Sequence, residues 1–347
     1  MDIKGILPKK NLSWQEAQTY LTIQRSRVSP EALLPPIAGE SYYFERFKEG
    51  ATIVPRCFWF VRPAVGEGLG IIDHAKPYLR THPDVERDAK EPWKGIEISG
   101  EVEASFLYAT LLGKHLLPFG YTKLDLVILP VEISEISVPM LNSQTALHDG
   151  YSGLHNWLSQ VENLWQARKK KSVKENVYQW LDYRRKLLSQ RSSGYYNVLL
   201  GTSGTHIASC VVDTTSESLE AEGRSTHGFL ADTKTFFYQT KELGEAHYLC
   251  ALLNSRYVDE AIKQYQTKGA WGERDIYRRP FEVLPIPKFN AKDKRHLRLT
   301  KLSQECHHKV AQLALEGKSI GSLRNKVRDY LSSELDEIDR LVKNILS

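Results

Sequence analysis

The sequence predicts an α+β protein with two β-rich lobes, a helical spacer between them and a C-terminal helical pair. Short runs rich in β-branched and aromatic residues indicate the lobes, and apolar residues at helical spacing indicate the spacer and the pair. With 347 residues, the chain is long enough for several such units. We expect an N-terminal α+β lobe over residues 1–150, the spacer over 151–192, a second β-rich lobe over 193–290 and the helical pair over 291–347.

Three elements are expected in the N-terminal lobe. Residues 52–61 are rich in β-branched and aromatic side chains and predict a strand, which Pro55 places at an edge or a bulge. Residues 124–133 form a nearly continuous apolar run, which predicts a buried strand. Residues 101–112 predict a helix. The apolar residues that fit its period are Val102, Phe106, Ala109 and Leu112.

The spacer is expected to be helical from residue 152 to 190, with two apolar faces. A basic triplet lies between these faces, formed by Lys169, Lys170 and Lys171. No acidic residue adjoins the triplet to pair with it. We therefore expect the three lysines to contact phosphates without reading bases.

The second lobe is expected to hold four strands and then one helix over residues 244–264. Glycine and serine turns separate the strands. The strands are predicted at residues 195–200, 207–212, 228–230 and 235–238.

The C-terminal pair is expected to consist of a helix from Leu299 to Leu313 and a final helix from Val327 to Ile345. The apolar spacing is close to a heptad, which favours antiparallel packing. On the final helix, Leu335, Ile338 and Val342 share one face, and we expect that face to be buried.

Composition favours a cytoplasmic protein. Hydrophobic residues make up 41% and charged residues 26% of the chain, and the net charge is +5. No apolar run is long enough to cross a membrane, and the four cysteines have no metal-binding or disulfide spacing. We therefore expect no membrane partner and no metal site.

The stretch from Lys268 to Phe289 carries the densest functional pattern. Two glycines flank Trp271, three arginines follow within six residues, and a Leu-Pro-Ile-Pro segment ends the pattern. Arg274 lies between two acids, so it either stiffens the turn through a local salt bridge or is oriented by them toward a base edge. Arg278 and Arg279 have no adjacent acid and are expected to contact phosphate.

These motifs resemble a known family. Residues 269–287 read GAWGERDIYRRPFEVLPIP and follow YLCALLNS at 248–255. Upstream stand GATIVPRCFWFV at 50–61 and AKEPWKG at 89–95. In this order, over roughly residues 40–347, they resemble the C-terminal target-recognition region of Eco57I-like and TaqI-like N6-adenine DNA methyltransferases of restriction–modification systems. The resemblance implies that both lobes are recognition lobes that bind double-stranded DNA.

The catalytic motifs of that family are missing. The Asp/Asn-Pro-Pro-Tyr/Phe loop is absent, since Leu34-Pro35-Pro36-Ile37 lacks both its polar start and its aromatic end. The glycines at 66–70 have the wrong spacing for a dinucleotide turn. The acids Asp84 and Asp88 are too close together for a metal-dependent nuclease motif. We therefore expect no catalytic residue and no cofactor in this chain.

The resemblance then implies a non-catalytic recognition module, with S-adenosylmethionine bound only by a separate methyltransferase catalytic domain or subunit. The expected DNA-binding residues are Lys169, Lys170, Lys171, Lys268, Trp271, Arg274, Arg278 and Arg279. Two alternatives stay open at this point. One is a protein–protein interaction scaffold, and the other is a nuclease with an unrecognised motif.

Overall fold

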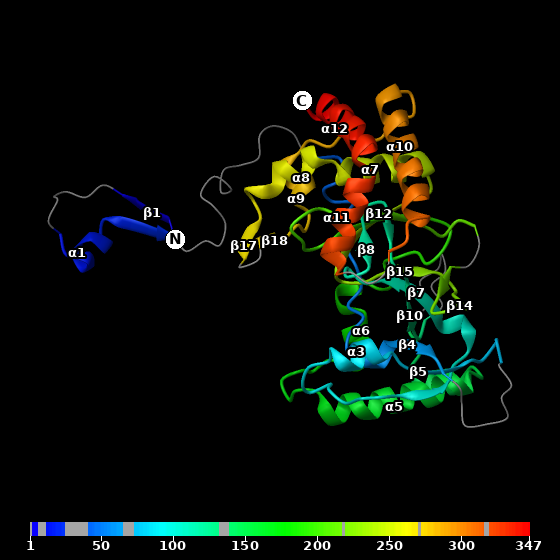
Figure 1. Cartoon of the computed structure of the whole chain (residues 1–347). Coiled ribbons are helices and arrows are strands. Elements are labelled where there is room, and N and C mark those ends of the chain that lie inside the picture. Colours follow the sequence, from blue (N-terminus) through cyan, green and yellow to red (C-terminus); the bar gives the residue numbers. More distant parts are fainter. Residues whose placement is uncertain are drawn as a thin grey trace.

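The computed structural model describes residues 2–5, 12–24, 41–64, 73–131, 139–216, 219–269, 272–315 and 319–347. Within them the chain is α+β, with two main sheets, helices against both and a helical C-terminus (Figure 1). The N-terminal elements are a two-stranded hairpin and a short helix. Their bounds are β1 Asp2–Gly5, α1 Trp14–Gln18 and β2 Leu21–Gln24.

The first sheet has six strands in the order β15-β7-β10-β4-β5-β6. Adjacent strands in this sheet are antiparallel, except that β15 and β7 run parallel to each other. The central strands are buried along their whole length, so both of their faces are covered. The strands are β4 Phe60–Pro63, β5 Tyr78–Thr81, β6 Ser99–Glu101, β7 Leu107–Leu111, β10 Asp125–Ile128 and β15 Phe229–Ala231.

Helices α2 to α6 pack around this sheet. The longest of them, α5, lies beside β6 in the lower part of Figure 1 and buries Leu154, Trp157, Leu158 and Val161. Its Trp157 indole donates a hydrogen bond to the Phe58 carbonyl at 3.0 Å. The bounds are α2 Arg56–Trp59, α3 Pro83–Arg87, η2 Ala104–Phe106, α4 Ser143–His148, α5 Ser152–Arg168, α6 Val177–Leu181 and η3 Tyr183–Arg185.

The second sheet has four antiparallel strands in the order β12-β11-β16-β3. Its strands are β3 Lys48–Glu49, β11 Tyr196–Gly201, β12 Ser209–Asp213 and β16 Thr235–Thr240. Three two-stranded ribbons complete the strands, namely β8 Leu116–Leu117 with β9 Gly120–Tyr121, β13 Glu220–Ala221 with β14 Arg224–Ser225, and β17 Thr267–Gly269 with β18 Gly272–Arg274.

Helix α7 covers the second sheet, and α10 covers α7. Helix α7 is buried along nearly its whole length, as a helix between two layers must be. The helices of this half are α7 Leu243–Asn254, α8 Arg256–Lys263, α9 Arg279–Val283, α10 Lys294–Ala311, α11 Ile320–Tyr330 and α12 Ser332–Leu346.

Two short strands cross between the expected lobes. Strand β15, from the second half of the sequence, completes the first sheet, and β3, from the first half, completes the second. The spacer segment is also part of the first core, because α5 lies against the sheet.

Several element predictions are confirmed. The four strands of the second lobe are present as β11, β12, β15 and β16, and the segment 124–133 contains β10. The C-terminal pair is present, with the final helix divided at Leu331 into α11 and α12. The predicted face of Leu335, Ile338 and Val342 is buried, and α12 packs on α10.

Other element predictions are wrong. Residues 101–112 form a single 3-10 turn and strand β7 instead of a helix, because Leu107–Leu111 is buried on both faces between two strands. The strand predicted over residues 52–61 is present only at its end, because the helical turn α2 occupies Arg56–Trp59 and β4 begins at Phe60. The helix predicted at 244–264 is broken at Ser255, whose extended backbone and hydroxyl cap α8. The helix predicted over residues 152–190 is also interrupted, because α5 ends at Arg168 and α6 begins only at Val177.

Candidate nucleic-acid interface

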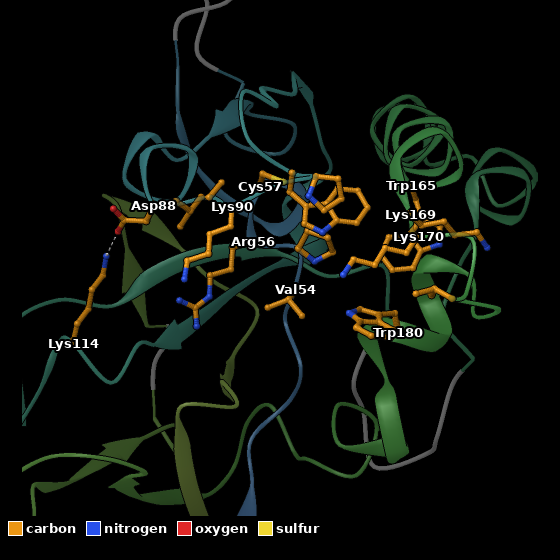
Figure 2. Close-up of a pocket in the computed structure, with 16 residues that line it drawn as sticks. Val54, Arg56, Cys57, Asp88, Lys90, Lys114, Trp165, Lys169, Lys170 and Trp180 are labelled. Atoms are coloured by element: carbon orange, nitrogen blue, oxygen red, sulfur yellow. Dashed lines mark ion pairs between the residues drawn. The ribbon is translucent and has the colours of Figure 1, made fainter. Parts of the chain in front are cut away.

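A cavity of about 460 Å³ opens where α2, the loop after α3, the end of α5 and α6 meet (Figure 2). Three tryptophans and five basic side chains contribute to its wall. It brings together segments that are far apart in the sequence, from Val54 to Trp180.

Local capping holds the two helices that form one side of the cavity. Helix α5 ends where Lys169 takes an extended conformation, and its backbone N–H still bonds to the Trp165 carbonyl. Helix α6 begins at Asn176, whose side chain accepts hydrogen bonds from the backbone of Tyr178 and Gln179 at 3.0 and 2.8 Å. These caps turn the chain sharply between Lys169 and Asn176 and set its side chains at the cavity edge.

The tryptophans form one continuous aromatic wall. The rings of Trp93 and Trp165 stack at a centroid distance of 5.3 Å and an interplanar angle of 8°, and Trp180 tilts against Trp165 at 5.9 Å. The Arg168 guanidinium donates to the carbonyls of Pro92 and Lys94 at 3.1 Å each, which fastens the Trp93 loop to the end of α5. The wall is therefore held by backbone contacts as well as by stacking.

The lining also carries five basic side chains. Arg56, Lys90 and Lys114 lie together on one side of the cavity, and Lys169 and Lys170, which follow α5, lie beside Trp165 on the other (Figure 2). Asp88 is the one acidic side chain in the lining, and it lies 3.8 Å from the Lys114 amino group. Within the described part of the chain, Lys90, Lys169 and Lys170 form no ion pair.

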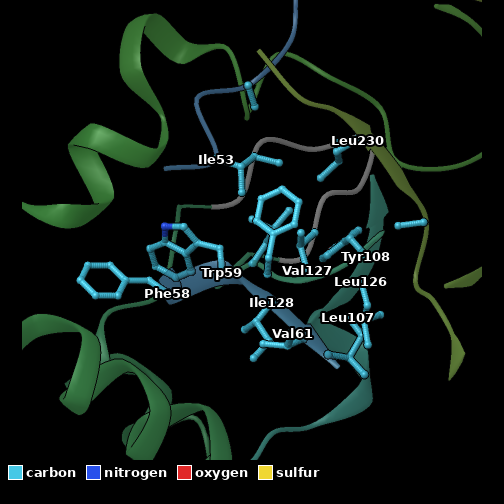
Figure 3. Close-up of a cluster of buried hydrophobic side chains, with 14 of the residues drawn as sticks. Ile53, Phe58, Trp59, Val61, Leu107, Tyr108, Leu126, Val127, Ile128 and Leu230 are labelled. Carbon is cyan, nitrogen blue, oxygen red and sulfur yellow. The ribbon is translucent and has the colours of Figure 1, made fainter. Parts of the chain in front are cut away.

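Arg56 ties this basic side to the hydrophobic core. Its Nη2 lies 2.9 Å from Oδ1 of Asp232, a residue with no exposed surface. Burial raises the pKa of Asp232 although Arg56 opposes that shift. The Arg56 Nε is also buried and has no hydrogen-bond partner among the described residues. Phe58 and Trp59, at the end of α2, belong to the hydrophobic core of the first sheet (Figure 3).

The one thiol in the cavity is not activated. Burial raises the pKa of the Cys57 thiol to about 12, which keeps it protonated and a poor nucleophile at neutral pH. The arrangement is therefore suited to binding an anionic, partly planar ligand. It offers no activated nucleophile among the lining side chains.

The basic triplet predicted from the sequence meets this cavity in part. Lys169 and Lys170 line it, and Lys169 Nζ donates to the Glu175 carbonyl at 3.3 Å. Lys171 is exposed beside them and does not line the cavity.

The second predicted group lies on another part of the molecule, around the β17–β18 ribbon (Figure 1). Lys268 lies opposite Glu273 in the backbone pairing of that ribbon, and the structure does not describe its side chain. Trp271 lies outside the described residues. Arg274 ends β18 and is exposed, while the neighbouring Asp275 accepts a hydrogen bond from the Thr267 hydroxyl.

The last two arginines are engaged within the fold. Arg278 lies over the Phe44 ring at 4.5 Å and donates to the Phe44 carbonyl at 3.3 Å. Arg279 lies 2.8 Å from Glu282 on the same helical turn. Arg279 has no acid adjacent in the sequence, but the helix brings Glu282, three positions later, alongside it.

The cavity itself was not predicted from the sequence. Trp93 stands in one of the motifs that carry the family resemblance, whereas Trp165 and Trp180 lie within the segment predicted as a helical spacer. The signal available was the presence of three tryptophans in basic segments. Nothing in their spacing indicates that they meet.

The described residues contain no cluster of three or more His, Cys, Asp and Glu side chains arranged to hold a metal ion. Among their helices, none is both long and apolar enough to cross a membrane.

Comparisons with known proteins gave structural neighbours only. No family model and no curated sequence matches the chain. The type IIL restriction–modification enzyme MmeI, solved in complex with DNA, superposes with a TM-score of 0.47 and 10% identity over 90% of this chain and 33% of that one. The type IIG restriction endonuclease BpuSI superposes with a TM-score of 0.35 and 13% identity, over 87% and 32%. The chain spans about a third of both solved proteins, and both TM-scores lie below 0.5.

Proposed function

We propose that the chain is a non-catalytic DNA sequence-recognition module of an N6-adenine methyltransferase or restriction–modification system, working in the cytoplasm. It binds double-stranded DNA and positions a separate catalytic domain or subunit, which holds S-adenosylmethionine and transfers the methyl group. The order of the family-like motifs along the sequence supports the choice of system.

The observation that carries the DNA-binding part is the basic end of α5. Lys169, Lys170 and Lys171 are consecutive, solvent-accessible and without an acidic partner in the described part of the chain. Surface lysines that are left uncompensated are suited to neutralise phosphates, and each contact releases condensed counterions from the duplex. Base reading is assigned to Arg274, the one exposed arginine of the β17–β18 ribbon.

The test is a salt series of duplex binding, measured by fluorescence anisotropy on the whole chain. Changing Lys169, Lys170 and Lys171 together to Ala should weaken binding to every duplex alike. The slope of log affinity against log salt should flatten by up to about three, roughly one for each lost phosphate contact.

A matched control removes two exposed lysines of α10, Lys294 and Lys301, which lie in the opposite part of the molecule (Figure 1). This variant should keep the slope of the unmodified protein. An unchanged slope in the triple variant would mean that the triplet faces away from DNA. Absence of any salt-dependent duplex binding would overturn the proposal and favour a protein-interaction scaffold.

A further inference from the structure

We propose that the cavity between α2 and α6 binds a single nucleotide unit, with the base at the tryptophan wall and the phosphate at the lysine rim. The inference deepens the DNA-recognition function and rests on it for the nucleotide's role. The source of the unit is either an unpaired nucleotide of the bound DNA or a free mononucleotide.

The charge balance of the cavity favours an anionic ligand. Asp88 compensates Lys114, and Asp232 compensates Arg56. The positive charges of Lys90, Lys169 and Lys170 remain uncompensated by any acidic side chain in the described residues. A phosphate group satisfies such a cluster, and its oxygens accept hydrogen bonds from the ammonium groups.

The tryptophan wall requires an apolar, planar part in the same ligand. Trp93 and Trp180 are half-buried, so each leaves part of its indole open to the cavity, while Trp165 behind them is 4% exposed. Nucleobases stack on such side chains without regard to sequence. Arg56, whose side chain is partly exposed, lies at the basic side of the same cavity.

The size of the cavity limits the ligand to one unit. Its volume of about 460 Å³ lies within the range of ~300–1,000 Å³ that is typical of small-molecule sites. A base pair within a duplex cannot enter such a space, because its bases are stacked and paired. A nucleotide of DNA reaches it only when it is unpaired or rotated out of the helix.

The first experiment titrates the full chain with dAMP by calorimetry, with deoxyadenosine as the comparison. We expect saturable binding of dAMP and at least about tenfold weaker binding of deoxyadenosine, which lacks the phosphate. The double variant Lys90→Ala/Lys170→Ala should lose at least about tenfold in affinity for dAMP, and Trp180→Ala should lose it as well.

Lys94→Ala is the matched control. Lys94 is exposed and adjoins Trp93, but it does not line the cavity, so dAMP binding should be unchanged. If Trp180→Ala fails to fold, the lysine double variant still decides, because both of its positions have solvent-accessible side chains. Absence of dAMP binding to the unmodified chain, or equal binding by the double variant, overturns the inference.

The second experiment separates the two sources. The chain is offered a duplex with one unpaired adenine and the same duplex fully paired. Tighter binding of the first, lost in Lys90→Ala/Lys170→Ala and competed by dAMP, supports an unpaired nucleotide of DNA. Equal binding of both duplexes together with dAMP binding supports a free mononucleotide. Duplex binding that depends on the lysine triplet, but without any dAMP binding, overturns this inference and leaves the proposed function standing.

Discussion

Arg56 lines the cavity and also stabilises the fold, because it is the ion-pair partner of the fully buried Asp232 carboxylate. Removing the guanidinium in Arg56→Ala leaves Asp232 without that cation in a site that excludes water. Breaking a buried pair in this way typically costs about 3–5 kcal/mol. We expect a loss of that size in the free energy of unfolding, measured by urea denaturation at pH 7.

The double variant Arg56→Ala/Asp232→Asn provides the control. An uncharged amide at residue 232 removes the isolated charge, so part of the lost stability should return. If Arg56→Ala alone changes the urea midpoint only slightly, the carboxylate is protonated in the folded protein.

Asp125 and His115 form a pair whose pKa values are shifted in opposite directions by burial. The Asp125 pKa rises from 3.8 to about 6, and the His115 pKa falls from 6.5 to about 4. Asp125 Oδ1 lies 3.7 Å from His115 Nε2, and Lys123 lies 3.7 Å from the same carboxylate oxygen. The Asp125 contribution to stability is present below pH 3.8 and lost as pH rises through 6. The His115 contribution is present above pH 6.5 and lost as pH falls through 4.

Single substitutions should separate these two opposed contributions. Other buried histidines, among them His247 and His307, also have pKa values lowered by burial, so each slope is compared with that of the unmodified protein. In Asp125→Asn the free energy of unfolding should rise more steeply with pH between 4 and 6 than in the unmodified protein. In His115→Gln it should rise less steeply between pH 4 and 6.5. Chemical denaturation at several pH values measures the three slopes. Changes of slope with the same sign in both variants would contradict the assignment.

At the scale of elements, α12 is held to the fold by an apolar face flanked by ion pairs. Ile338 has no exposed surface, and Arg298 of α10 makes a bidentate contact with Glu337 at 2.7 and 2.8 Å. Ile338→Ala should therefore lower the free energy of unfolding by about 2–5 kcal/mol in urea. Ser333→Ala, at an exposed position of α12, should change it by no more than about 0.5 kcal/mol. A near-zero effect of Ile338→Ala would identify this face as an open docking surface.

The elements differ in how well the sequence predicts them. The face of Leu335, Ile338 and Val342 follows from local spacing, since one side of α12 is solvated and the period is plain. Strand β7 was predicted as a helix because Leu107–Leu111 is buried on both faces, which removes the alternation that marks a half-exposed strand. The break at Ser255 depends on a hydroxyl cap inside an otherwise helical pattern.

At the scale of the whole molecule, the cavity depends on long-range contacts that local patterns do not encode. Trp93 and Trp165 stack only because α5 lies along the first sheet, and Trp180 joins them only because the chain turns after Lys169. The basic triplet was predicted because its three lysines are adjacent in sequence. Its neighbours Arg56 and Lys90 come from segments about eighty or more positions away, and the fold alone brings them together.

The fold also separates the two predicted groups of DNA contacts, and that separation is testable. The triplet lies at the end of α5, and Arg274 lies on the β17–β18 ribbon in a different part of the molecule (Figure 1). Distant sites without shared partners add their effects to within about 0.3–0.5 kcal/mol. In the proposed methyltransferase, reassembled with its catalytic domain or subunit, Arg274→Ala should cost about 1–3 kcal/mol on the recognised sequence and relax the preference at one base position. The triple lysine variant should bind all sequences more weakly by the same factor, and the combined variant should show the sum of both losses.

Competition across single-base variants of the recognised site measures the base preference of each variant. A preference profile that Arg274→Ala leaves unchanged would rule out base reading by this residue.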